Sequence, residues 1–178
     1  MIQKIKALKL DRNRTVLIYL SLISITIQII WLIVDKSTPA WDQSAHLINA
    51  LNFQRVVEKI SLFSSDWWYE FWAQTSSYRA PLVYILTVPY LSIFGKGLNT
   101  GLLVNTLFIP VIVSSTYYLS RQVFSSQVSL WAAGLCLLFP TLVDIQLDYL
   151  LDYSIVATII FAKKANIKIG RGRVGKEC

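Results

Sequence analysis

The sequence predicts an all-α, polytopic transmembrane protein whose outer-face loop carries interfacial helices. Of its 178 residues, 54% are hydrophobic and 15% charged, whereas soluble domains are nearer a quarter charged. Uncharged runs long enough to cross a membrane recur along the chain. The net charge of +7 comes mainly from basic residues near the two ends of the chain, a pattern typical of charges that orient membrane spans. We therefore expect the membrane, and no nucleic acid, as the partner of these charges.

The first span is predicted at residues 15–34, an uncharged run rich in Ile and Leu. At about 1.5 Å per residue it reaches about 30 Å, the thickness of one hydrocarbon core. The run is too long for the apolar part of a signal peptide, and no small-residue cleavage site follows it. The basic residues that precede it predict a cytoplasmic N-terminus.

An outer loop is expected over residues 35–96, and its first part, residues 42–60, has the spacing of an amphipathic helix. Asp42 is placed to cap this helix. The apolar side is expected to consist of Ala45, Leu47, Ile48, Leu51, Val57 and Ile60.

Aromatic residues crowd the middle of the loop, where residues 66–72 carry three Trp, one Tyr and one Phe. Such density is typical of a belt at the level of the lipid headgroups, although the same side chains can also form a wall on which a sugar ring stacks. Residues 81–94 follow as an apolar run that contains Pro89, which we expect to break it. At about 21 Å this run is short of a crossing, and it is expected to lie in the interface.

Two further spans are predicted at residues 97–120 and 122–143, neither of which contains a charge. Residues 153–162 form a partial, fourth apolar run that is too short to cross. Residues 1–162 are therefore expected to form one transmembrane portion, and residues 163–178 a basic tail of different character. Cys136 and Cys178 have no partner at a metal-binding spacing.

Whether residues 81–94 cross decides on which side the acids at the end of the third span emerge. If the segment crosses, Asp148 and Asp152 lie on the cytoplasmic side and can never meet Asp42. If it stays in the interface, Arg121 lies inside and the acids share the outer face with Asp42. The short length of the segment, Pro89 and the place of Arg121 favour the second topology.

Acids gathered at a membrane surface suit glycosyl transfer from a lipid carrier. The reaction needs a carboxylate that takes the proton from an acceptor hydroxyl, and positive charge or a metal ion that stabilises the departing phosphate. Asp42 is the candidate base, and Arg79 the candidate ligand of the donor phosphate. Asp148 or Asp152 then orients the acceptor or helps to hold a divalent metal ion.

Each candidate also has a structural explanation. Asp42 can be a helix cap, Arg79 can extend to lipid headgroups, and Asp148 can be a solvated acid at the end of a span. His46, one helical turn after Asp42, is a weak candidate metal ligand, because one His and one Asp rarely suffice.

The order of these features resembles the GT-C superfamily of membrane glycosyltransferases that use polyprenyl-phosphate sugars. The likeness is to the branch that holds dolichyl-phosphate-mannose–protein mannosyltransferases and the bacterial enzyme that adds aminoarabinose to lipid A. It covers about residues 15–160 and depends on the order of its motifs. The matching segments are 39–42 (PAWD), 78–84 (YRAPLVY), 93–95 (IFG), 117–124 (YYLSRQVF), 139–140 (FP) and 149–153 (YLLDY).

The resemblance implies that Asp42 is the catalytic acid and that Asp152 lies in the same site. It also implies an interfacial segment after the Pro-Leu-x-Tyr motif. The chain departs from the family pattern at Gln43, where a second acid is common, which weakens a metal-binding role more than catalysis. Family members continue through many more spans, so the resemblance implies that this chain is the N-terminal part of a truncated enzyme.

The function expected from the sequence is an inverting glycosyltransferase of the plasma membrane, if the source is bacterial. Its donor is an isoprenoid-phosphate sugar, and its acceptor a lipid, protein or glycan. The alternative is a non-enzymatic integral membrane scaffold or an inactive fragment. A transporter is disfavoured, because the predicted spans lack the ionisable groups of an ion path.

Overall fold

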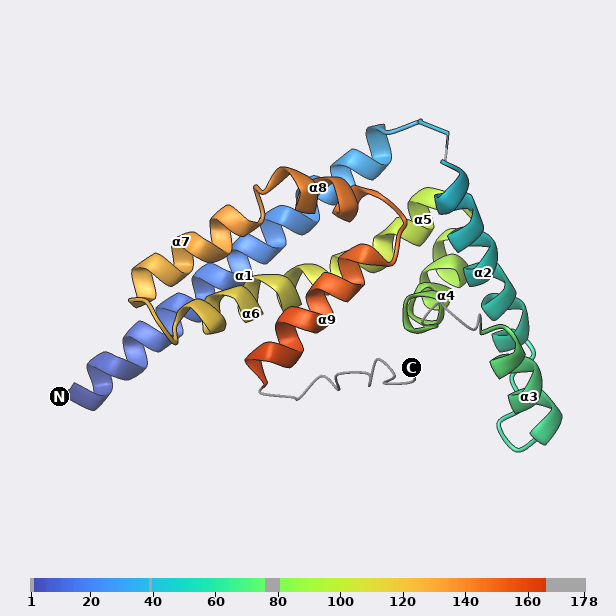
Figure 1. Ribbon diagram of the computed structural model, residues 1–178, viewed down its shortest axis with the longest axis horizontal. Helices are drawn as coiled ribbons and strands as arrows, with labels where there is room; N and C mark the ends of the chain where they lie inside the picture. The colour runs from blue at the N-terminus through green and yellow to red at the C-terminus, as the bar shows by residue number, and fades with distance from the viewer. Residues whose placement is uncertain (1, 39, 76–80, 166–178) are drawn as a thin grey trace, which may run out of the picture.

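The computed structural model describes residues 2–38, 40–75 and 81–165, with side chains described from Arg12 onward (Figure 1). Within these residues all regular secondary structure is helical, which confirms the predicted all-α class. The elements are α1 (Ile2–Val34), α2 (Trp41–Val57), α3 (Ser65–Ala73), α4 (Leu82–Phe94), α5 (Leu98–Leu102), the 3₁₀ helix η1 (Leu103–Leu107), α6 (Phe108–Ser120), α7 (Ser126–Cys136), α8 (Pro140–Leu147) and α9 (Asp152–Lys164).

Two helical stretches are long and apolar enough to cross a membrane. They are Arg12–Val34 of α1 and Leu98–Ser120, which α5, η1 and α6 form together. Both agree with the runs predicted at residues 15–34 and 97–120. The pair formed by α7 and α8 is a third candidate if its two bent halves count as one span.

The run predicted as one span at residues 122–143 is not a single helix. A turn occupies its first residues, α7 begins only at Ser126, and α8 continues to Leu147. Between α7 and α8 the direction changes by 51°. Pro140 explains the break, because proline lacks the N–H that a continuous helix needs and disfavours helical backbone in the residue before it. Phe139 accordingly has an extended backbone, with ψ of 118°.

Helix α4 lies against α2 and does not continue the direction of the long helices (Figure 1). It runs through Pro89 without interruption, so the expected break is wrong. Gly95 ends it with φ of 100°, a conformation that glycine adopts without strain. Lys96, just beyond, pairs with Glu58 at the end of α2, 4.0 Å away.

The face that α2 buries agrees only in part with the predicted one, because Leu47, Leu51 and Val57 pack against the core while other members of the predicted face do not. Ile48 and Ile60 of the predicted apolar side are exposed, at 57% and 58%. The buried residues are His46, Ala50, Phe53, Gln54 and Val56. Aromatic packing determines this face, because Phe53 contacts Phe71 of α3 edge-on and stacks on Tyr84 of α4.

The long helices have two distinct ends (Figure 1). Near the N-terminal end of α1, the Asn13 amide donates to the Tyr117 hydroxyl at 3.0 Å and the Ser126 hydroxyl at 3.2 Å. This contact places the turn that contains Arg121 beside Asn13, in the N-terminal half of α1. At the other end, the Asn99 amide donates to the carbonyl oxygens of Leu32 and Asp35, at 2.8 and 3.3 Å.

Candidate functional site

The site centres on a hydrogen bond between the start of α2 and the segment that joins α8 to α9. Gln43 Nε2 donates to Asp148 Oδ1 at 2.6 Å, across 105 positions of sequence. Gln43 directly follows Asp42, the predicted base. The two acidic segments that the sequence analysis assigned to one face therefore meet in the structure.

The backbone at Asp148 is held in place by a side chain of η1. The Asn105 amide donates to the backbone carbonyl oxygens of Gln146, at 2.9 Å, and Asp148, at 3.2 Å. Asn105 is fully buried. Its two bonds add to other bonds on the same carbonyls, because the Leu150 N–H donates to the Asp148 carbonyl at 2.9 Å and Gln28 Nε2 donates to the Gln146 carbonyl at 3.5 Å.

A second buried amide connects the same segment to the first span. Gln28 Nε2 of α1 donates to the Leu102 carbonyl at 3.1 Å, and the Gln146 side chain returns a bond to Gln28 Oε1 at 3.3 Å. Buried amides with satisfied bonds fix the relative positions of the elements that carry them. The position of Asp148 is thus determined by α1, η1 and α8 together.

The surroundings of Asp148 raise the pKa of its carboxyl above the ordinary value of 3.8. Burial of the carboxyl raises its pKa, and the neighbouring Asp144 raises it further. The hydrogen bond from Gln43 acts in the opposite direction and lowers the pKa, but the net change is upward.

Asp42 does not cap α2, so that prediction is wrong. Ala40 occupies the cap position and no side chain makes a capping bond there. The helix begins at Trp41, one residue earlier than predicted, which moves Asp42 into the first turn. There its charge interacts favourably with the helix dipole while its side chain stays exposed.

Asp144 and Asp152 are exposed, and in the sequence they precede and follow Asp148. Asp152 is the first residue of α9, where a negative charge stabilises the helix. Asp144 lies on α8. The structure gives Asp152 a place near the site but no bond to Asp42 or Gln43.

His46 faces the protein interior. It is 8% exposed, its Nδ1 lies 2.6 Å from the Tyr84 hydroxyl, and its ring stacks on that of Tyr84. Asp42, one turn earlier, is exposed, so the two side chains do not converge as a metal pair would. Among the described residues no group of three or more His, Cys, Asp or Glu side chains could hold a metal ion. Arg79, the predicted phosphate ligand, lies outside the described residues.

Sequence reasoning missed the amides that build the site. The predicted spans contain no charge, but Gln28 and Asn105 are uncharged polar residues inside them. A buried amide in an apolar span is a signal in itself, because leaving its polar atoms without partners is costly. Gln43 was noted only as a missing acid, and its role as a donor depends on the tertiary contact.

No protein-family model, curated protein or solved structure matches the chain in the comparisons made with each.

Proposed function

We propose that the chain is a multi-pass integral membrane protein that acts in glycosyl transfer. The donor is a sugar on a polyprenyl phosphate, and the acceptor is a lipid, protein or glycan. The observation that carries the proposal is the hydrogen bond from Gln43 to Asp148, which joins the acid-bearing segments at one end of an apolar helix bundle. This end lies away from the N-terminus, so a cytoplasmic N-terminus places the site at the outer face of the membrane.

The roles of the acids follow from their surroundings. Transfer forms a bond from the acceptor oxygen to the sugar carbon, breaks the bond from that carbon to the phosphate oxygen, and releases the acceptor proton. Asp42 is exposed at the edge of the site and takes this proton. Asp148, held by Gln43 and Asn105, positions the acceptor hydroxyl. Arg79 neutralises the leaving phosphate.

The donor reaches this end of the bundle through the membrane plane. The exposed surface of α1 is rich in Ile, as expected for a helix in contact with lipid. A polyprenyl chain dissolves in the same hydrocarbon and keeps its phosphate at the surface. The site lies where such a phosphate would be found.

The test is transfer of a radiolabelled sugar from a polyprenyl-phosphate donor by the chain reconstituted in lipid vesicles. General acid–base catalysis contributes about 10²–10⁴-fold to a rate, and we expect Asp42→Asn to lose a factor of that size. Asp66→Asn is the matched control, because Asp66 also lies in the first turn of an outer helix and is exposed. If the Asp42→Asn variant transfers sugar as fast as the parent chain does, Asp42 is not the base. Absence of both transfer and donor binding in the parent chain would favour the non-enzymatic scaffold.

A further inference from the structure

Helix α3 has three chemically distinct faces. Trp67 and Phe71 are buried against α2, and the Trp67 Nε1 donates to the Val56 carbonyl at 3.0 Å. At about 100° per residue, Asp66 and Glu70 form a second strip. Trp68, Tyr69 and Trp72 form the third face, which we name the aromatic surface.

The aromatic surface is exposed. Trp68 is 39% exposed, Trp72 52% and Tyr69 81%. The loop before α3 enlarges it, because the Trp68 Nε1 donates to the Leu62 carbonyl at 2.9 Å and keeps the exposed Leu62 beside the helix. An exposed apolar patch of this kind in a folded protein indicates an interaction site.

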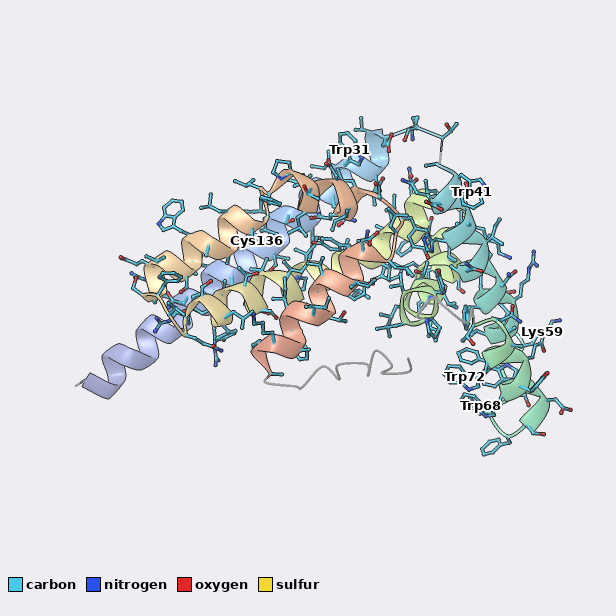
Figure 2. All side chains as sticks on the ribbon, in the orientation of Figure 1. Trp31, Trp41, Lys59, Trp68, Trp72 and Cys136 are labelled. Atoms are coloured by element: carbon cyan, nitrogen blue, oxygen red, sulfur yellow. The ribbon has the colours of Figure 1, made fainter. Side chains whose placement is uncertain are left out.

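The direction of these side chains points to their partner. In Figure 1, α2 and α3 run across the end of the long apolar helices. Figure 2 shows Trp68 and Trp72 on the side of this arm that faces the long helices, and Lys59 on the opposite side. A bilayer that surrounds the long helices would therefore meet the aromatic surface, while Lys59 would face water.

A sugar-binding wall fits the surface less well. The surface has a shallow hollow of about 420 Å³, lined by Trp68, Tyr69, Trp72 and Ala73. Sites for polar ligands add precisely placed polar groups to the apolar lining. The lining carries no charged side chain, and the Trp68 N–H is already donated to Leu62.

We propose that the aromatic surface lies in the headgroup layer of the lipid bilayer and holds the arm formed by α2 and α3 against the membrane. The inference relies on the proposed membrane placement and not on the transfer chemistry. Trp and Tyr suit this layer because each has an apolar ring and a polar edge. The contact gives the end of α2 that carries Asp42 a fixed height above the membrane.

The experiment uses single fluorescent labels in phosphatidylcholine vesicles. With Cys136→Ser and Cys178→Ser as background, a nitrobenzoxadiazole label is attached through Tyr69→Cys on the aromatic surface. Glu70→Cys, the neighbouring exposed residue on the acidic strip, is the matched control. Ile27→Cys on α1, 62% exposed, reports whether the protein is inserted. Circular dichroism of each variant establishes that it is folded.

We expect nitroxide-labelled phosphatidylcholine to quench the label at position 69 several-fold more than the label at position 70, and aqueous iodide to show the reverse order. The label at position 27 should be quenched by the lipid as well. If position 27 is quenched by lipid and position 69 is not, the aromatic surface does not contact lipid and only this inference fails. If position 27 is not quenched, the membrane placement fails too. Protection of position 69 from iodide by maltotriose, without quenching by lipid, would identify a carbohydrate surface instead.

Discussion

Replacing Gln43 by Glu should destabilise the fold by placing two carboxylates in contact. In the structure Gln43 Nε2 donates to Asp148 Oδ1 at 2.6 Å. Gln43→Glu has nearly the same shape but removes this donor and adds a negative charge beside an existing one. The added carboxylate should raise the pKa of Asp148 further, in the same direction as Asp144 does.

The magnitude follows from two contributions. A hydrogen bond to a charged acceptor contributes about 1.5–3 kcal/mol. Two carboxylates about 4 Å apart repel by about 4 kcal/mol at an effective dielectric constant near 20, an upper value that movement and protonation reduce. We expect a loss of about 2–4 kcal/mol in the free energy of unfolding at neutral pH. The loss should diminish at acidic pH, where one carboxyl is protonated and can donate to the other.

Unfolding by sodium dodecyl sulfate in mixed micelles, followed by circular dichroism, measures this free energy. Gln127→Glu is the control, because Gln127 is exposed on α7 and the same change there brings no carboxylate into contact. The double variant Gln43→Glu/Asp148→Asn exchanges donor and acceptor and should recover most of the loss. If Gln43→Glu is as stable as Gln127→Glu, and the double variant shows no coupling between the two positions, the contact does not support the site.

Three further changes test the surroundings of the site. For Asp148→Asn, the gain in stability relative to the parent chain should grow as pH rises above the ordinary carboxyl pKa of 3.8. The reason is that the raised pKa makes the ionised form unfavourable in the folded state; a difference that is constant with pH would contradict it. Asn105→Ala should cost about 1–3 kcal/mol in the same unfolding assay, because it removes two hydrogen bonds that contribute about 0.5–1.5 kcal/mol each. Pro140→Ala should straighten the 51° bend between α7 and α8, so spin labels at Val128 and Asp144 should move apart; an unchanged distance would assign the bend to packing.

Much of the fold follows from the distribution of charge along the chain. Two predicted spans coincide with long apolar helices because an uncharged run of sufficient length has few alternatives to a helix in an apolar environment. The run predicted at residues 122–143 is not one helix, because Pro140 lacks the N–H that a continuous helix needs. Proline had the opposite outcome at Pro89, where α4 continues because its packing against α2 compensates for one lost hydrogen bond.

The site was only partly predictable. The length of the segment at residues 81–94 indicated that Asp42 and Asp148 share one end of the molecule, and the contact between Gln43 and Asp148 agrees with this. The cap predicted at Asp42 was wrong because the helix begins one residue earlier than its polar start suggests. The face of α2 depends on Phe53 and its aromatic neighbours on α3 and α4, and no local pattern in α2 reveals those contacts.

Gln43 stands where the GT-C superfamily, which the sequence resembles, commonly carries a second acid. In this chain a second acid at position 43 would face the carboxylate of Asp148, whereas an amide donates to it.

The central claim is that the segment with Asp42 and the acids after α8 share the outer face of the membrane, opposite Arg121. The most direct test is labelling of single cysteines in intact cells with a membrane-impermeant maleimide, using Arg121→Cys and Asp152→Cys in the cysteine-free background. The account predicts that position 152 is labelled from outside, and that position 121 is labelled only after the membrane is permeabilised. Labelling of position 121 from outside, with position 152 protected, would contradict it.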